Sequence, residues 1–169
     1  MPRPRREGHH PAPPPGASDI VGTYDLAGAP GHLIRRAQQV HIEIWGQLVD
    51  GGLTSPQFAV LCALGRDRGI DQTRLSLLAS LDTSTCQGVV SRLQERGLLE
   101  RARDPQDGRR WLLALTPRGE ATLARVLPAV IEVGERLLEP LTRQEGVELR
   151  RLLAKVAVRG PAVSRVRGS

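Results

Sequence analysis

Aromatic residues and lysine are both scarce in this chain. Phe, Trp and Tyr together make up 2% of its 169 residues, and the only lysine is Lys155. Aromatic side chains are enriched in strands, so their shortage favours helices over a β-sandwich. Leu, Val, Ile and Ala must fill the core, and we predict one mainly α-helical domain with tails.

Cysteine and long apolar runs are also scarce or missing. Two cysteines, Cys62 and Cys86, do not make a disulfide framework or a metal site, and we expect no cofactor. No run approaches the roughly 18 apolar residues that a membrane span needs. The N-terminus is charged but lacks the apolar segment of a secretory signal, so we expect a protein of the reducing cytoplasm with no membrane partner.

Positive charge is abundant and is carried by arginine. The formal net charge is +6 and the sequence pI is about 10.8. Arginine binds phosphates and guanine edges through a planar fork that lysine does not have. The charge is compatible with nucleic acid but does not prove it, because anionic membrane surfaces attract the same charge.

The two ends of the chain differ from its middle. Residues 1–30 form a Pro/Arg-rich segment that we expect to be a disordered arm, either a solvated tail or an arm that touches DNA phosphates. Residues 159–169 are expected to be a flexible basic tail. The segment between them, 31–158, is expected to be a single domain of six helices and a small hairpin.

Capping residues divide that domain into helices. His32 to about Val49 has apolar residues on more than one side, which predicts a helix buried by several neighbours and ended by Gly51-Gly52. Ser55, Asp71 and Asp82 are expected to cap the next three helices, and Gly97 to end the third.

The C-terminal part begins with a hairpin. Two short apolar runs, 98–101 and 111–115, flank the polar segment 103–110, which predicts two strands with a long charged tip. Thr116-Pro117 then starts a helix that Pro128 should kink or divide. Thr142 and Glu145 form a capping box for the last helix.

Two short helices joined by a tight turn and followed by a hairpin indicate a winged helix-turn-helix. In the helix after Asp82, one side is apolar, with Cys86, Val89, Val90 and Leu93, and the other is small and polar. Such a face suits the floor of a DNA major groove, although a solvated face is the alternative. The candidate DNA-contacting residues are Thr83, Ser84, Thr85, Gln87, Gly88, Ser91 and Arg92.

The predicted hairpin tip is the second candidate DNA contact. An arginine at such a tip can enter the narrow minor groove, and the tip holds Arg103, Arg109 and Arg110. Asp107 is expected to pair with a nearby arginine and hold it extended. The alternative is a loop whose charges only keep it soluble.

Four sequence blocks resemble the multiple antibiotic resistance regulator (MarR) family. They are Leu53–Leu61, Leu81–Thr85, Val90–Leu98, and Arg103–Arg110 followed by Leu115–Gly119. The resemblance covers about residues 32–158. It implies a MarR-like homodimer that reads a pseudo-palindromic double-stranded DNA operator, with Arg109 as the minor-groove arginine and Asp107 as the wing aspartate. Gly108 stands where many relatives carry another basic residue.

The same resemblance implies a repressor relieved by a small, often phenolic or aromatic acid. It divides the domain into a DNA-binding lobe, 54–116, and dimerisation helices, 31–50 and 117–158. The terminal helices carry more apolar surface than one small core can bury, which also predicts a dimer. The expected ligand-binding residues are Arg35, Arg36, Gln39, His41, Trp45 and Phe58. The alternative is that Trp45, Phe58 and His41 are core residues, which is the commoner role of such side chains, and that Arg35 and Arg36 are solvated.

Three alternatives remain open. An enzyme is disfavoured because the sequence has no glycine-rich phosphate loop, nucleophile elbow or metal-ligand cluster. A redox switch would use Cys86, whose helical phase points it inward, where a thiol is inert. An architectural winged helix would bind DNA without reading its sequence, so its specific and non-specific affinities would differ little.

Overall fold

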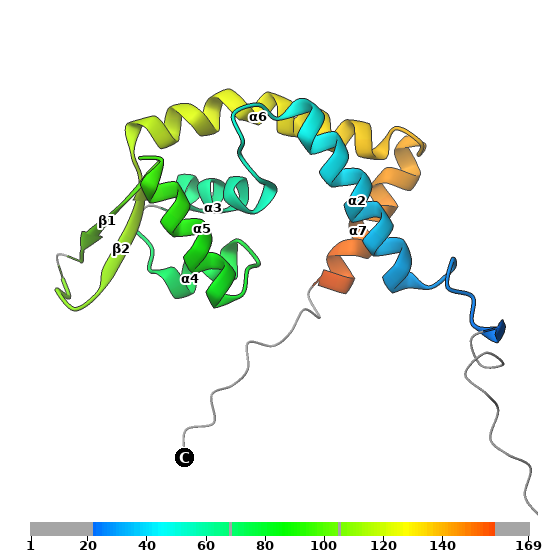
Figure 1. Ribbon diagram of the computed structural model, residues 1–169, viewed down its shortest axis with the longest axis horizontal. Helices are drawn as coiled ribbons and strands as arrows, with labels where there is room; N and C mark the ends of the chain where they lie inside the picture. The colour runs from blue at the N-terminus through cyan, green and yellow to red at the C-terminus, as the bar shows by residue number, and fades with distance from the viewer. Residues whose placement is uncertain (1–21, 68, 105, 158–169) are drawn as a thin grey trace, which may run out of the picture. The chain divides into compact units, whose positions relative to one another are not determined.

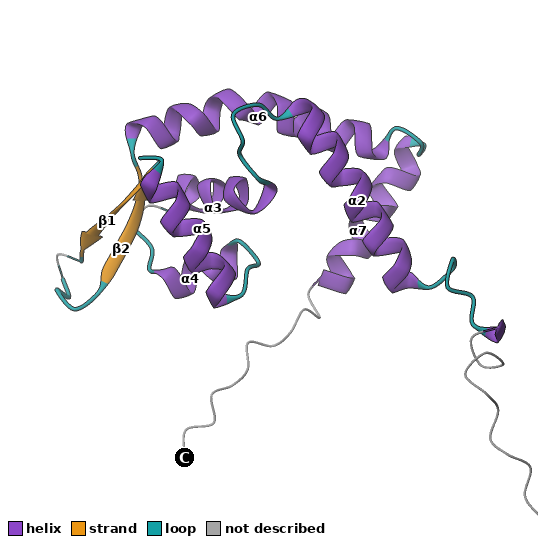
Figure 2. Cartoon of the chain, in the orientation of Figure 1, coloured by secondary structure: helices purple, strands orange, loops and turns teal. Residues whose placement is uncertain are grey.

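The computed structural model describes residues 22–67, 69–104 and 106–157. The chain divides into two compact units, Met1–Gln38 and Gln39–Ser169, which are described separately. The described part contains six named helices and one two-stranded sheet (Figures 1 and 2). This confirms the predicted fold class. None of the described helices combines the length and the hydrophobicity needed to cross a membrane.

The first unit holds the start of helix α2, Pro30–Leu48. Residues 1–21 of the expected arm lie outside the described residues, as does the tail from residue 158 onward. Residues 22–29 belong to the arm expected to be disordered. All of them except the half-buried Ala29 are exposed, and they include a turn in which the Asp25 carboxylate accepts a hydrogen bond from the Gly28 amide (3.0 Å). Helix α2 begins at Pro30 rather than His32, because proline fits the first turn of a helix, where its missing N–H is not needed.

The remainder of α2 belongs to the second unit and leads into residues 54–116, here called the lobe. The helix ends at Leu48, and Gly51 and Gly52 form the turn after it with φ angles of 83° and 63°. These left-handed angles favour glycine because it has no Cβ. The buried Trp45 side chain secures this turn, donating its indole N–H to the Leu53 carbonyl (2.7 Å).

Three helices form the body of the lobe: α3 (Ser55–Arg66), α4 (Gln72–Leu78) and α5 (Thr83–Glu95). The expected cap Ser55 is wrong, because Ser55 is already helical and Thr54 is the cap. Thr54 and Gln57 exchange side-chain and backbone hydrogen bonds in a capping box, and this places the boundary one residue earlier. Asp71 and Asp82 cap α4 and α5 as predicted.

The hairpin, here called the wing, follows α5. Gly97, with φ of 66°, ends that helix as predicted, and strands β1 (Leu99–Arg103) and β2 (Trp111–Leu115) pair antiparallel. A bridge from Leu113 to Ile70 joins the wing to the residue that precedes the cap of α4. The shared core contains fully buried side chains from α3, α4, α5 and β2, namely Val60, Leu61, Leu64, Leu75, Cys86, Leu93 and Leu113.

Two helices complete the described chain: α6 (Pro117–Leu138) and α7 (Arg143–Ala157). Pro128 lies inside α6, and the helix continues through it undivided, so division is not the one of the two expected outcomes that occurs. Buried Val126 and Val133 lie on either side of the proline, so the helix keeps the same face on the core throughout. The Thr142–Glu145 capping box before α7 is present as predicted.

Candidate DNA-binding surface

Helix α5 separates its side chains into two faces, as its sequence predicts. Four apolar residues are at most 6% exposed and pack in the core: Cys86, Val89, Val90 and Leu93. The opposite face is solvent-exposed along its length and contains Ser84, Gln87, Gly88 and Ser91. An added Cβ at Gly88 would have no atom within 4 Å, so the space directly in front of this residue is open.

A carboxylate organises the N-terminus of α5. Asp82 accepts hydrogen bonds from the Ser84 hydroxyl (2.6 Å), the Thr85 hydroxyl (2.6 Å) and the Thr85 amide (2.9 Å). These bonds, led by the one from Ser84, hold the pKa of Asp82 far below its usual range. Both hydroxyl protons are therefore directed to Asp82. Thr83 and Arg92 are exposed near the two ends of the helix.

The C-terminus of α5 is fastened to the turn after α2. The Arg96 guanidinium donates to the carbonyls of Gly51 (2.8 Å) and Gly52 (3.1 Å). The two left-handed glycines leave two consecutive carbonyls within reach of one guanidinium. Sequence analysis missed Arg96 because its partners lie some 45 residues away, and a Gly-Gly pair indicates a turn but not what binds it.

The three arginines of the wing tip have different surroundings. The Arg103 guanidinium lies 4.1 Å from the centre of the Trp111 ring and donates to the Gly108 carbonyl (2.8 Å). Arg110 forms an ion pair with Asp71 (2.6 Å), the cap of α4. The Arg109 guanidinium has no hydrogen-bond or ion-pair partner among the residues that the structure describes.

The expected role of Asp107 is wrong in one respect. Its carboxylate accepts from the backbone amide of Arg109 (3.0 Å) and does not pair with an arginine side chain. An aspartate commonly stabilises a turn by accepting from the backbone amide two residues further on. Because this bond uses a backbone amide, it occupies no arginine side chain. Asp107 thus shapes the tip, and the Arg109 guanidinium stays available.

The surroundings of Cys86 argue against a thiol switch. Its side chain is fully buried, and burial, together with the nearby Asp82 charge, raises the pKa of the thiol. The thiolate is the reactive form, so a buried thiol with a raised pKa reacts slowly with oxidants. Among the described residues, no group of three His, Cys, Asp or Glu side chains could hold a metal.

The residues expected to bind a ligand fall into two sets. In the second unit, His41, Trp45 and Phe58 form a row in which neighbouring ring centres are 5.7 Å apart. The Nδ1 atom of His41 is buried and has no hydrogen-bond partner there. Gln39 is exposed. In the first unit, Arg35 and Arg36 are also exposed, and Arg35 contacts His32 Nδ1 (2.8 Å).

Comparison with known proteins gives consistent matches. The MarR family profile matches residues 51–110. The HTH-type transcriptional repressor NicR of Pseudomonas putida is 38% identical over 145 residues, covering 84% of this chain and 91% of the relative.

Two solved structures extend the match to most of the fold. The PcaV regulator of Streptomyces coelicolor, in complex with its natural ligand, has a TM-score of 0.75 and 45% identity, covering 79% of this chain and 95% of PcaV. Bordetella bronchiseptica BpsR, whose DNA binding is regulated by 6-hydroxynicotinic acid, has a TM-score of 0.76 and 35% identity, covering 79% and 96%. With its exposed recognition face and its wing, the chain belongs to the MarR family of winged helix-turn-helix transcriptional regulators.

Proposed function

We propose that this chain is a homodimeric repressor that reads a pseudo-palindromic operator and releases it when a small aromatic acid binds. The observation that carries the DNA part is the exposed face of α5, which holds small polar side chains beside a wing in which the Arg109 guanidinium has no partner among the described residues. Such a protein would act in the cytoplasm, where its DNA lies. The relatives named above are transcriptional regulators, which agrees with a binding function.

Helix α5 has the features of a recognition helix. Gln87 is exposed at its centre and can form two hydrogen bonds with an adenine edge in the major groove. Gly88 adds no side chain where the helix would approach the bases, and Ser91 continues the same face one turn on. Arg109 would enter the adjacent minor groove, where the negative potential is strongest.

The exposed apolar side chains support a homodimer. In the single chain, Val40 of α2 is 49% exposed, Ile131 of α6 is 56% exposed and Val147 of α7 is 58% exposed. The several neighbours expected around α2 are therefore not provided by the described chain itself, and a second copy would provide them. The proposed dimerisation segments are 31–50 and 117–158, outside the reading lobe 54–116. Sedimentation should give a dimer at micromolar concentration, and a stable monomer would contradict this proposal.

A twofold dimer also fixes the spacing of its target. The two α5 helices would read half-sites about one helical turn apart, roughly 10 base pairs. Footprinting that found a single, asymmetric half-site would oppose the proposed arrangement.

We propose that the row of His41, Trp45 and Phe58 forms one side of the effector-binding site. A buried imidazole nitrogen without a partner is costly, and a carboxylate or hydroxyl of a ligand would satisfy it. Aromatic rings beside it offer a surface for a flat ring. BpsR, which matches over most of the fold, is regulated by an acid of this type.

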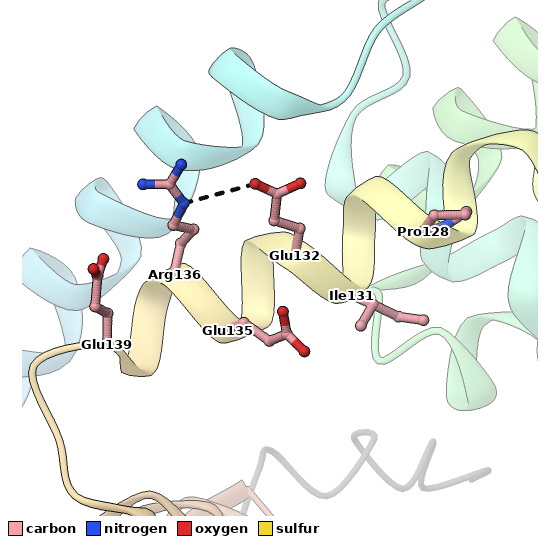
Figure 3. Close-up of a pocket in the computed structure, with 6 residues that line it drawn as sticks. All are labelled: Pro128, Ile131, Glu132, Glu135, Arg136 and Glu139. Atoms are coloured by element: carbon pink, nitrogen blue, oxygen red, sulfur yellow. Dashed lines mark ion pairs between the residues drawn. The ribbon is translucent and has the colours of Figure 1, made fainter.

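A hollow on α6 is a poorer candidate for an acid. It is lined by Pro128, Ile131, Glu132, Glu135, Arg136 and Glu139 (Figure 3). Three carboxylates would repel an anion, and its one cation, Arg136, lies 3.7 Å from Glu132 in an ion pair.

A titration at stated salt tests the DNA part. Fluorescence anisotropy with the DNA flanking the chain's own gene should give an affinity at least roughly a thousandfold above that for unrelated DNA. Gln87→Ala should weaken specific binding by about 1–3 kcal/mol and relax the preference at one base pair. Equal affinities for both DNAs would indicate an architectural binder instead.

A second titration tests the effector. 6-Hydroxynicotinic acid and substituted benzoic acids, added to the protein–operator complex, should lower the anisotropy, since a ligand favouring the released state must weaken DNA binding. His41→Ala should abolish this response while DNA binding persists. If no acid changes either the anisotropy or the melting temperature, the effector proposal fails and the DNA-binding proposal is unaffected.

A further inference from the structure

In the wing, Arg103 packs on Trp111, and this contact is here called the brace. It gives the arginines of the wing different roles. We propose that Arg103, stacked on Trp111, is a positioning residue that holds the wing tip in the form in which Arg109 contacts DNA. Sequence analysis expected Arg103 and Arg109 to act alike. This inference rests on the proposed DNA-binding function, and it explains how the wing tip is held in its binding form before DNA is present.

The stack lies where the two strands open into the tip. Arg103 is the last residue of β1 and pairs directly with Trp111, the first residue of β2. At 4.1 Å from the ring centre, its guanidinium is well within the range of a cation–π contact. Arg101 lies two residues earlier on the same face of the strand, 5.8 Å from the same ring. The indole is 43% exposed, so these arginines cover part of an apolar surface that the core does not bury.

The same guanidinium also reaches the tip itself. Arg103 donates to the carbonyl oxygen of Gly108 (2.8 Å), and Asp107 accepts from the amide of Arg109 (3.0 Å). That carbonyl and that amide belong to one peptide group, so the plane directly before the Cα of Arg109 is held at both ends. A planar peptide held at both its oxygen and its nitrogen fixes where the following Cα lies, and leaves rotation about the N–Cα bond as the remaining freedom on that side.

The residue after Arg109 is also held. The Arg110 side chain is paired with Asp71 at the start of α4, and its amide donates to the Asp107 carbonyl (2.8 Å). Within the described part of the chain, Arg109 is thus the one guanidinium of the three tip arginines without a partner, and it is flanked on both sides by anchored groups. Holding a loop in its bound form reduces the entropy lost on association.

Two variants that preserve charge test the brace in DNA binding. Trp111→Leu removes the ring and Arg103→Lys removes the planar fork, and each should weaken operator binding about tenfold. Neither changes the net charge, so the slope of log affinity against log salt should stay as in the wild type. Arg109→Gln is the contrasting variant. The magnitude of its slope of log affinity against log salt should decrease by about one per wing, because a DNA contact is lost.

The double variant distinguishes the brace from a direct contact. If Arg103 and Trp111 act as one unit, Arg103→Lys with Trp111→Leu should bind no more than about twofold worse than either single variant. If Arg103 touches DNA itself, Trp111→Leu will bind like the wild type, or the two losses will multiply. Either of those results would overturn the inference.

A readout without DNA separates this inference from the proposed function. Trp45 is buried and Trp111 is exposed, so acrylamide quenches mainly Trp111 in the full chain. Arg103→Gln should uncover the ring and increase the quenching constant, whereas Arg110→Gln should leave it nearly unchanged. Unchanged quenching in Arg103→Gln would refute the stack even if operator binding is normal. A chain that shows the stack but binds no operator would refute the proposed function instead.

Discussion

Gly88 allows stability and DNA binding to be changed in opposite directions. It lies on the exposed face of α5, and an added Cβ there would meet no atom within 4 Å. Replacing a glycine inside a helix with alanine stabilises the helix by about 0.8–1.0 kcal/mol. For a chain of 169 residues that gain corresponds to a rise in melting temperature of roughly 2–4 °C.

The same methyl group should weaken operator binding. If α5 enters the major groove with Gly88 nearest the bases, the methyl displaces the helix and strains the neighbouring contacts of Gln87. Losing the two hydrogen bonds of such a side chain costs about 1–3 kcal/mol per half-site, or roughly 5- to 150-fold in affinity. Gly88→Ala should therefore unfold at a higher temperature and yet bind its operator at least about fivefold more weakly.

Thermal unfolding and anisotropy on the same preparation measure both effects. Gly46→Ala is the matched control, because Gly46 is an exposed glycine of helix α2 with nothing within 4 Å of an added Cβ. Because Gly46 lies in the proposed dimerisation segment 31–50, Gly46→Ala is a control for the helix-stability effect alone. A Gly88→Ala protein that is more stable and binds DNA as tightly as the wild type would show that this face does not approach the bases.

Three further predictions concern the fold that supports the site. Gly119→Ala should destabilise the chain by about 1–3 kcal/mol or more in urea unfolding, because its Cβ would lie 1.9 Å from the Leu98 carbonyl oxygen. Unchanged stability would contradict that packing. Trp45→Phe should cost about 1–3 kcal/mol by leaving the buried Leu53 carbonyl without its indole donor, and a midpoint equal to wild type would show that water replaces it. Because the pKa of Asp82 is lowered by folding, its stabilising effect is present above about pH 4, near the unfolded value, and is lost as the pH falls towards the folded value. Asp82→Asn should therefore unfold with a weaker pH dependence below pH 4, as measured by helical circular dichroism.

Much of the fold could be predicted because its signals are local. A cap and its amide partner lie three residues apart, as at Asp71 and Asp82, so the sequence itself displays both partners. The two faces of α5 follow from helical spacing alone, and burial in the structure agrees with that division. The error at Ser55 has the same local origin, since Thr54 beside it is an equally good cap and only the geometry distinguishes them.

Contacts between distant residues could not be predicted in this way. Arg110 and Asp71 are 39 residues apart, and Arg96 reaches Gly51 across 45. Both bonds require the register of the wing and the packing of α5, which single residues do not reveal. The sequence therefore identified the wing arginines as a group but did not distinguish the anchored Arg110 from Arg109.

Contacts within the structure also limit what the hydroxyl groups at the start of α5 can bind. Phosphate oxygens only accept hydrogen bonds, so a hydroxyl can bind them only by donating its proton. The protons of Ser84 and Thr85 already go to Asp82, and the Asp82 charge itself repels phosphate. The oxygens keep lone pairs, which can accept from the exocyclic amines of adenine or cytosine. In this arrangement the start of the helix is better suited to reading base edges than to binding the backbone, and the exposed Arg92 and Arg109 are left to supply the attraction for phosphate.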